Sequence, residues 1–291
     1  MGKLVTVHEM IEEGSKRLEE CNKANFKIEA ELLALNVLGY TKLERILKAN
    51  NKVAREDEET YWDYISKRCQ GIPLQYITRE QEFMGFPFYV DSNVLIPRQD
   101  TETLIEAIID KSRETPFRNI IEIGTGSGCI SVSLAKFLPY SEITAIDISA
   151  NALEVARKNA KINQVEDRIK WIQGDLLTNY ISDKKIDLIV SNPPYIRTQD
   201  CMELDYEVRK HEPNLALDGG RDGLDFYRKI TRQSKEHLIE NGMLAYEIGH
   251  DQSKDVYNIM DRNGFTNIRQ IKDLAGRDRV VLGRFKGMLN E

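Results

Sequence analysis

The chain has 291 residues, 41% of them hydrophobic, and a formal net charge of −6. This length favours one large domain with a smaller second domain, and leaves ample apolar material for a core. The acidic balance disfavours a protein that holds long nucleic acid directly through its phosphates, because such proteins carry a basic face. No apolar stretch approaches the roughly 18 residues of a membrane span, and the amino-terminal segment lacks the apolar core of a signal peptide, so we expect neither membrane binding nor export.

The cysteines and histidines form no recognisable ligand set. Cys21, Cys69, Cys129 and Cys201 are widely separated and contain no C-x-x-C pair, which disfavours both a zinc site and a disulfide framework. None of the four histidines lies at metal-ligand spacing to another histidine or to a cysteine. We therefore expect no metal, free thiols and a cytoplasmic location.

Residues 1–75 are predicted to be helical throughout. Thr6 and Glu9 have the spacing of a capping box, Gly39 ends a second apolar helix, and a fourth helix runs through residues 58–70. The apolar residues recur at helical spacing, which is typical of helices that bury one face. The segment therefore predicts a small bundle of short helices.

The hydrophobic period then changes. Alternating apolar residues and turn residues predict a β-hairpin linker within residues 76–98. Over residues 99–291, strand-like runs alternate with helices, which predicts βαβ units and a Rossmann-like, seven-stranded, mostly parallel α/β sheet. The last two runs are joined only by "AGRD", which is too short for a crossover helix, so the last strand is expected to be antiparallel.

A glycine-rich loop follows the first strand of this α/β domain. In "EIGTGSGCI", glycines let the backbone approach a ligand closely and aim helix N–H groups at it. The loop lacks the lysine of a P-loop and the last glycine of the dinucleotide fingerprint, which leaves G-x-G-x-G. The next strand ends at Asp147, which could hold a ribose, and the third ends at Asp175. An incidental glycine turn, with Asp147 capping the next helix, is the alternative.

With these motifs the chain resembles the S-adenosylmethionine-dependent methyltransferases. The resemblance implies that Asp147 holds the ribose of S-adenosylmethionine, that Asp175 lies near its adenine amine, and that Asn192 borders the cofactor. Glu122, beside the loop, could reach the cofactor's ammonium group or only cap backbone. The methionine part would pass the loop residues Gly124, Thr125, Gly126, Ser127 and Gly128.

The segment "SNPPYI" follows the fourth strand, and its prolines cannot continue strand pairing. The Asn192 side-chain oxygen and the Pro193 carbonyl can accept hydrogen bonds from both hydrogens of a planar –NH2 group and so aim its lone pair. Pro194 has no N–H to compete for that lone pair, and Tyr195 offers a flat face. The acceptors become charge-assisted as the nitrogen gains positive charge. The motif predicts methyl transfer to nitrogen but leaves adenine, cytosine and glutamine open, and a simple strand-ending turn is the alternative.

Nearly the whole chain is similar to the release-factor glutamine methyltransferases, the HemK or PrmC family. The similarity lies in the helical first domain and in "PLQYI", "VLIPRQDTE", "SNPPYI", "HEPNLALDGGRDGL" and "DLAGRDRVV". It implies N5-methylation of the glutamine in the Gly-Gly-Gln loop of class I peptide-chain release factors, with S-adenosylhomocysteine as the product. One departure is Gln99, where the family commonly has proline, so this loop is expected to be less rigid.

Three other functions stay open at this point. A close sister family modifies a glutamine of a ribosomal protein. A DNA or RNA amino-methyltransferase would need a basic groove or a target-recognition domain, and the sequence shows neither. A catalytically dead adaptor would not need the intact Asn192–Tyr195 motif. We expect a monomer in which residues 1–75 recognise the release factor.

Overall fold

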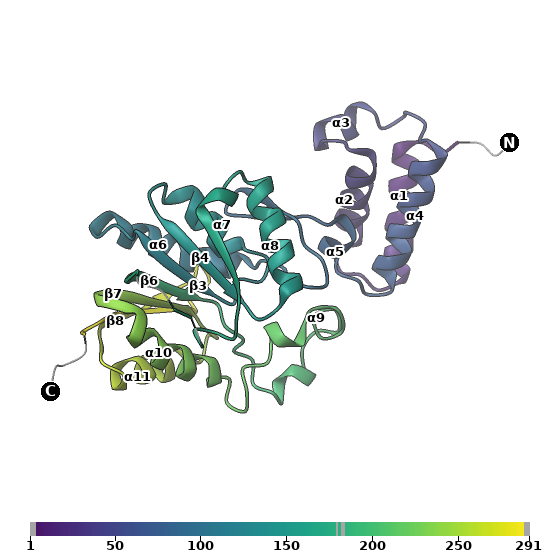
Figure 1. The fold of residues 1–291 in the computed structure, drawn as a ribbon. Coiled ribbons are helices and arrows are strands. Elements are labelled where there is room, and N and C mark those ends of the chain that lie inside the picture. Colours follow the sequence, from purple (N-terminus) through teal and green to yellow (C-terminus); the bar gives the residue numbers. More distant parts are fainter. Residues whose placement is uncertain (1–3, 179, 182–183, 288–291) are drawn as a thin grey trace. The chain divides into compact units, whose positions relative to one another are not determined.

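The computed structural model describes residues 4–178, 180–181 and 184–287, which form two compact units (Figure 1). The first unit comprises the described residues up to Arg79 together with the short helix α9 (Tyr206–His211). The second comprises residues 80–205 and the described residues from 212 onward. No helix in the described ranges is long and apolar enough to cross a membrane.

The first unit is all helical, as predicted. Thr6 and Glu9 form the expected capping box, and Gly39 ends α2 in the left-handed conformation with a φ of 62°. Gly14 allows α1 to approach α4, because a Cβ atom there would lie 2.0 Å from the Tyr61 hydroxyl oxygen. The helices of this unit that precede α9 are α1 (Val7–Glu20), α2 (Phe26–Leu38), α3 (Lys42–Leu47), α4 (Arg55–Cys69) and α5 (Leu74–Thr78).

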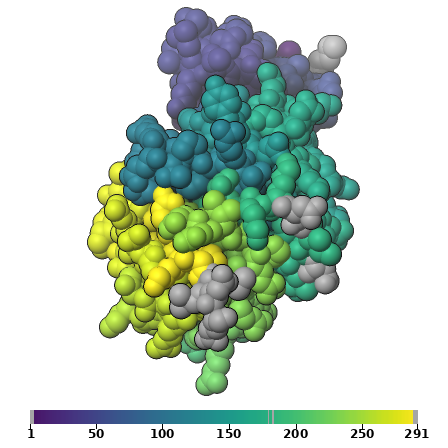
Figure 2. Space-filling view, turned by 60° about the vertical axis from the view of Figure 1, so that its left-hand side comes forward, coloured from purple at the N-terminus to yellow at the C-terminus, as the bar shows by residue number. Residues whose placement is uncertain are grey.

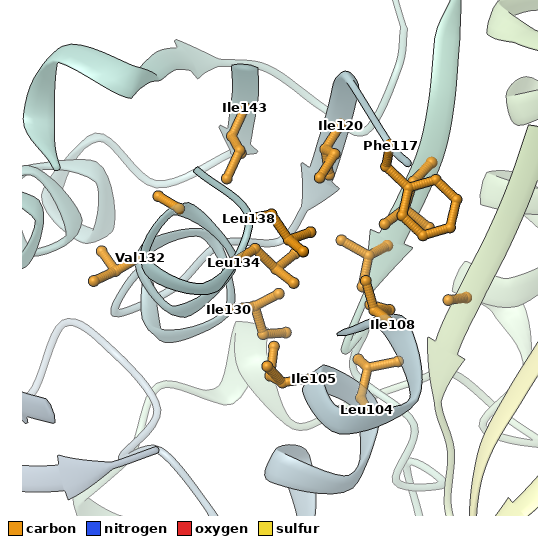
Figure 3. Packing of buried hydrophobic residues seen from close by; sticks show 14 of the residues in the cluster. Leu104, Ile105, Ile108, Phe117, Ile120, Ile130, Val132, Leu134, Leu138 and Ile143 are labelled. Atoms are coloured by element: carbon orange, nitrogen blue, oxygen red, sulfur yellow. The ribbon is translucent and has the colours of Figure 1, made fainter. Parts of the chain in front are cut away.

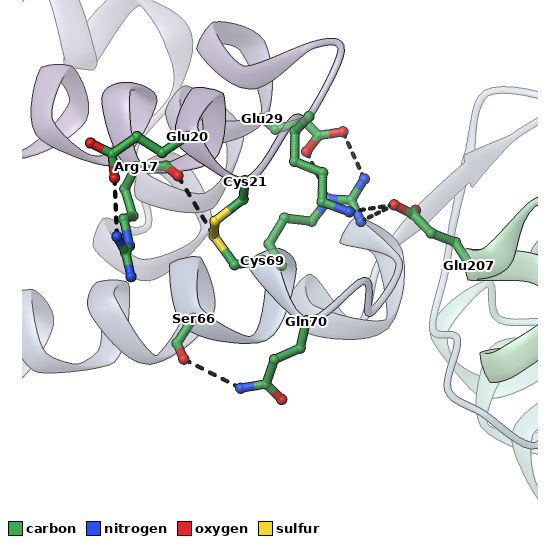
Figure 4. Close-up of a disulfide and its surroundings, with 10 residues drawn as sticks. Arg17, Glu20, Cys21, Glu29, Ser66, Cys69, Gln70 and Glu207 are labelled. Atoms are coloured by element: carbon green, nitrogen blue, oxygen red, sulfur yellow. Dashed lines mark hydrogen bonds and ion pairs between the residues drawn. A yellow bond between two sulfur atoms is a disulfide. The ribbon is translucent and has the colours of Figure 1, made fainter.

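A disulfide joins Cys21 and Cys69 (Figure 4). Cys21 caps the carboxyl end of α1 and Cys69 is the last residue of α4, so the bond ties two helix ends together. The expectation of free thiols is therefore wrong for this pair. The two cysteines are 48 residues apart in sequence, and only the packing of α1 against α4 brings them together. Cys129 and Cys201 are free.

Arg68 anchors α9 to the other helices of this unit. Its side chain is buried and lies 2.7 Å from Glu29 Oε2 of α2 and 2.7 Å from Glu207 Oε1 of α9. Lys23 Nζ contacts the same Glu207 oxygen at 2.7 Å. Two cations on one carboxylate therefore hold α9, and Figure 4 shows Glu207 reaching this cluster.

The second unit is built on a seven-stranded sheet with the order β5-β4-β3-β6-β7-β9-β8. The first five of these strands run parallel, while β9 is antiparallel to both β7 and β8. This arrangement confirms the predicted mostly parallel sheet with an antiparallel last strand. The strands are β3 (Asn119–Ile123), β4 (Glu142–Asp147), β5 (Ile169–Gln173), β6 (Ile186–Ser191), β7 (Leu238–Glu247), β8 (Phe265–Lys272) and β9 (Asp278–Phe285).

Helices cover both faces of the sheet (Figure 1). On one face α6 (Glu102–Glu114), α7 (Cys129–Phe137) and α8 (Ala150–Ile162) pack against residues such as Ile120 (Figure 3). On the other face α10 (Asp225–His237) and α11 (Ser253–Arg262) pack against residues such as Ile121. Neighbouring strand residues thus enter different cores, which explains the almost continuous apolar runs in these strands.

A β-hairpin of β1 (Gln81–Phe83) and β2 (Phe86–Phe88) opens the second unit. Its Phe83 and Phe88 rings meet edge to face and join the core under α6. The yellow carboxy-terminal strands contact the blue-teal segment that includes α6 (Figure 2). The hairpin and the last strands therefore share one core with the parallel part of the sheet.

Candidate active site

The glycine loop connects β3 to α7 at the carboxyl edge of the sheet. Gly124 and Gly126 have φ angles of 73° and 52°, and a Cβ atom at either would meet no other atom within 4 Å. The backbone here therefore faces open space, as a loop that passes along a ligand must. Gly128 has a different role, since a Cβ there would lie 3.0 Å from the Ala156 Cβ. That glycine allows α7 to pack closely on α8.

Glu122 lies beneath this loop and is 1% exposed. Its Oε2 accepts hydrogen bonds from the Thr125 hydroxyl at 2.7 Å, from the Ser131 backbone N–H at 3.0 Å and from the Ser131 hydroxyl. Burial raises the pKa of this carboxyl to about 7. Its Oε1 is buried with no hydrogen-bond partner among the described residues. One oxygen thus fastens the loop, and the other remains available beside it.

Asp147 is the last residue of β4 and contacts the glycine loop directly. Its Oδ2 accepts a hydrogen bond from the Gly126 N–H at 2.8 Å, and its Oδ1 accepts one from the Ser149 N–H at 2.9 Å. The alternative that Asp147 caps the next helix is wrong, because Ser149 is the capping residue of α8. Asp175 lies two residues beyond the end of β5 and is exposed. The structure therefore brings Asp147 and Gly126 together, and places Asp175 on the neighbouring strand end.

Asn192 is the first residue after β6, which lies beside β3. The Ser191 hydroxyl donates to the Ile123 carbonyl at 2.7 Å, so the start of this segment is fixed to the end of β3 beside Gly124. Asn192 and Tyr195 are half-buried and Pro193 is buried. The Asn192 Nδ2 donates to the Thr101 hydroxyl at 3.4 Å.

A loop far along the chain supports the Asn192–Tyr195 segment. The Ile196 N–H donates to the Leu217 carbonyl at 3.0 Å. A Cβ atom at Gly219 would lie 2.7 Å from the Pro194 carbonyl oxygen, and one at Gly223 would lie 2.3 Å from the Tyr195 carbonyl oxygen. These two glycines therefore let the loop press against the segment. In the sequence, "HEPNLALDGGRDGL" stands out only by its family resemblance, although its closely spaced glycines indicate such a close approach.

The segment at the start of α6 connects four parts of the unit. It includes the 3-10 helix η1 (Gln99–Thr101), and four of the five side chains from Arg98 to Glu102 each have a different partner. Their contacts are Arg98 Nη2 with Glu212 Oε1 at 2.5 Å, Asp100 Oδ2 with Arg279 Nη2 at 2.8 Å, Thr101 Oγ1 with Asn192, and Glu102 Oε1 with the Met84 N–H at 2.6 Å.

The Tyr195 hydroxyl and the Cys129 thiol do not supply a nucleophile at neutral pH. Burial raises the pKa of the Tyr195 hydroxyl to about 12 and that of the Cys129 thiol to about 12. Both groups therefore stay protonated. The arrangement offers hydrogen-bond acceptors and a flat ring, which suits orienting a substrate rather than forming a covalent bond to it.

Comparison with known proteins identifies both parts of the chain. Residues 9–78 match the family model "PrmC N-terminal domain", and residues 99–209 match "Methyltransferase small domain". The chain is 41% identical to the release factor glutamine methyltransferase of Clostridium acetobutylicum, over 91% of this chain and 93% of that protein. It is 39% identical to the protein of the same name from Moorella thermoacetica, over 96% and 98% of the two chains.

Solved structures agree at the level of the fold. A methyltransferase from Pyrococcus furiosus has a TM-score of 0.51 and 20% identity, covering 71% of this chain and 91% of that one. The hMettl16 catalytic domain, solved in complex with MAT2A 3'UTR hairpin 6, has a TM-score of 0.56 and 18% identity, covering 78% and 83%. The fold and the full-length similarity together confirm the prediction from the sequence: the chain belongs to the release factor glutamine methyltransferase family.

Proposed function

We propose that this protein transfers a methyl group from S-adenosylmethionine to the side-chain amide nitrogen of the glutamine in the Gly-Gly-Gln motif of a peptide-chain release factor. The observation that carries the proposal is the half-buried Asn192, whose Nδ2 is engaged by Thr101 so that its oxygen is free to accept. The release factor as partner is supported by the names of relatives that match over nearly their whole length.

The residues at the carboxyl edge of the sheet fit S-adenosylmethionine. Gly124 and Gly126 leave space next to the backbone, and Glu122 Oε1, which has no hydrogen-bond partner in the described part of the chain, lies beneath the loop that would carry an ammonium group. We assign the methionine part to Gly124–Gly128, the ribose to Asp147 and the adenine side to Asp175. When bound, the cofactor supplies an activated methyl group on a positively charged sulfur.

The protein itself orients the accepting nitrogen. The Asn192 oxygen and the Pro193 carbonyl accept the two amide hydrogens, which turns the nitrogen lone pair toward the methyl group. These acceptors gain strength as positive charge develops on the nitrogen. Pro194 offers no N–H to compete, and Tyr195, whose hydroxyl stays protonated, presents the face of its ring to the planar amide. Since the Tyr195 hydroxyl and the Cys129 thiol stay protonated, neither supplies a nucleophile, and we propose direct transfer of the methyl group to the amide nitrogen.

The helical unit is assigned to recognition of the release factor. A Gly-Gly-Gln loop is narrow, because its glycines have no side chains, so it can enter the site but offers little surface for recognition. Further contacts must come from elsewhere, and the helical unit carries none of the proposed cofactor residues. We also propose that the protein acts as a monomer, since one chain supplies the whole proposed site, and that it acts in the cytoplasm, where it would meet the release factor.

Mass spectrometry of a purified release factor, incubated with this protein and S-adenosylmethionine, tests the proposal. The expected result is a gain of one methyl group on the Gly-Gly-Gln glutamine, with no metal added. A variant factor with glutamate in place of that glutamine is the control and should gain none. Equal or faster methylation of a ribosomal protein, DNA or RNA would overturn the substrate assignment.

A further inference from the structure

Glu247 is a buried carboxyl that the proposed methyl transfer does not use. It is the last residue of β7 and is 1% exposed. Strands β6 and β7 are parallel, and their register pairs Ser191 with Tyr246. The next residues along the two strands, Asn192 and Glu247, therefore lie beside each other.

Thr101 lies next to both residues. The Asn192 Nδ2 donates to the Thr101 hydroxyl at 3.4 Å, and the side chains of both residues are close enough to the Glu247 carboxyl to lower its pKa. An ionised carboxylate can only accept hydrogen bonds. The Thr101 hydroxyl, which accepts from Asn192, has its own hydrogen left to donate to Glu247. This direction turns the NH2 group of Asn192 toward Thr101 and leaves its oxygen facing away.

An ion pair does not explain the presence of Glu247. The positive charge of Arg279 lowers the pKa of the Glu247 carboxyl, but the Arg279 guanidinium forms its ion pairs with Asp100 at 2.8 Å and Asp273 at 3.3 Å. The Glu247 Oε2 is buried and has no hydrogen-bond partner within the described part of the chain. A buried carboxyl oxygen without a donor costs stability, so a gain in stability does not account for this residue.

We propose that Glu247 is a positioning residue, which acts through Thr101 to hold the Asn192 amide with its oxygen toward the methyl-accepting nitrogen. The inference rests on the methyl transfer proposed above and adds the group that selects the productive orientation. A side-chain amide rotated by half a turn would present its NH2 group to the substrate –NH2, and two donors cannot bond. Glu247 prevents this rotation only while it is ionised, because a protonated carboxyl can also donate.

The carboxyl should change its charge near neutral pH. Burial raises the pKa of Glu247 to about 7, against the lowering effect of the Thr101 hydrogen bond and the Arg279 charge. The orientation of Asn192 is therefore maintained above this pH and is lost as the pH falls. Tyr195 and Cys129, with pKa values of about 12, stay protonated in this range. The charged or titratable groups facing Glu247 are Arg279 on β9, Asp100 on η1, Tyr195 after β6, Tyr227 on α10 and Cys129 on α7.

Kinetics of four variants test the pathway through Thr101. At pH 8, Glu247→Gln should lower kcat about tenfold, as the loss of one charged hydrogen bond would, with less than about twofold change in KM for the cofactor. Thr101→Val should cause a similar loss, whereas Thr101→Ser keeps the hydroxyl and should recover most of kcat. The double variant of Glu247→Gln and Thr101→Val should be no worse than either alone, since both break one chain of bonds. Simple additivity, or a parent kcat in Thr101→Val, would overturn the inference.

The pH dependence gives a second test. The kcat of the parent protein should fall below pH 7, and this fall should disappear in Glu247→Gln. Glu122→Gln is the control, because the pKa of Glu122 is also raised to about 7 by burial. An acid limb that disappears in Glu122→Gln but persists in Glu247→Gln would contradict the assignment.

Nuclear magnetic resonance of the free protein gives a readout independent of turnover. With 15N-asparagine labelling, the Asn192 side-chain NH2 signals can be assigned from their loss in Asn192→Asp. They should shift with a midpoint near pH 7, and the shift should be absent in Glu247→Gln and in Thr101→Val. If the protein methylates no release factor but this titration is present, the proposed function fails while the positioning contact stands. Signals that do not titrate in the parent would exclude the contact.

Discussion

The side chain of Asn192 is half-buried at the end of β6, with its nitrogen on Thr101, so its oxygen is the group available to a substrate. Asn192→Ala should lower kcat on the release factor by about 10²–10³, comparable to removing one preorganised polar contact at a developing charge. Asn192→Asp keeps an acceptor oxygen and should be more active than the alanine variant. Single-turnover rates with saturating cofactor measure both, and an alanine variant with the parent rate would show that this side chain does not orient the substrate.

Asp147 tests the cofactor assignment. Asp147→Ala should weaken binding of S-adenosylmethionine by about 1.5–3 kcal/mol, as expected for lost hydrogen bonds to a charged group. Part of this loss will come from the glycine loop, because Asp147 also accepts from the Gly126 N–H. Titration calorimetry measures the affinity of the parent protein and of Asp147→Ala for S-adenosylmethionine, and Asp175→Ala serves as a comparison. An unchanged affinity in Asp147→Ala would remove the ribose assignment.

Some residues of the site could be predicted from the sequence because they belong to short local patterns. Gly124–Gly128 and Asn192–Tyr195 each come directly after an apolar strand. Glu247 could not be found in this way, since it lies inside the apolar run "GMLAYEIG" and its contacts with Thr101 and Asn192 join segments far apart in the chain. The pairing of Cys21 with Cys69 was missed for the same reason. Long-range contacts depend on helix packing, which spacing alone does not encode.

The loop after α9 contains Gly223, which allows close packing against the Asn192–Tyr195 segment. Gly276 has almost the same φ angle but lies in open space. Gly223 has a φ of 74° and would place a Cβ atom 2.3 Å from the Tyr195 carbonyl oxygen, whereas Gly276 has a φ of 76° and would meet nothing within 4 Å. Gly276→Ala should cost only the roughly 1–2 kcal/mol of left-handed strain. Gly223→Ala should cost more and also lower kcat, because Tyr195 must move. Thermal unfolding and methyl-transfer assays compare the two, and equal effects on both measurements would show that the loop does not support the site.

The disulfide between α1 and α4 is a second element with a measurable effect. Closing a loop across 48 residues should stabilise the helical unit by about 2–4 kcal/mol, mainly by restricting the unfolded chain. Cys21→Ser, or added dithiothreitol, should therefore lower the midpoint of a chemical unfolding transition of this unit. Cys201→Ser is the matched control, since Cys201 is a free thiol in the other unit. An unchanged midpoint after reduction, confirmed by thiol alkylation, would contradict the expectation.

At the scale of the whole molecule, the sheet topology could be predicted from the sequence, but the assignment of each segment to one of the two units could not. Seven apolar runs, a four-residue link before the last of them and a helical start were sufficient to predict the sheet and its antiparallel strand. Membership of α9 in the helical unit could not be predicted. It depends on Glu207 meeting Lys23 and Arg68, and a single glutamate in a polar helix gives no such signal.

If the helical unit binds the release factor and the other unit carries out methyl transfer, a change in the helical unit should affect KM for a protein substrate but not for a short peptide. The helical unit exposes apolar side chains on α3, including Leu43 at 65% and Leu47 at 74%. Leu47→Asp should raise KM for the intact release factor several-fold if this surface meets the partner, and leave kcat/KM for a short Gly-Gly-Gln peptide unchanged. Leu274→Asp is the control, because Leu274 is fully exposed on the other unit. Equal losses on peptide and protein would argue against a recognition role for this surface.

The membership of α9 in the helical unit has a consequence for synthesis of the protein on the ribosome. Residues 4–79 emerge well before Glu207, which two of their cations bind and which is made more than a hundred residues later. At a translation rate of roughly 5–20 residues per second this interval is on the order of 10 s. During that time Arg68 has Glu29 but lacks Glu207, while strands β3 to β6 are already being added. During this interval the nascent helical unit lacks α9. It can be completed only when the segment that follows the Asn192–Tyr195 motif has left the ribosome.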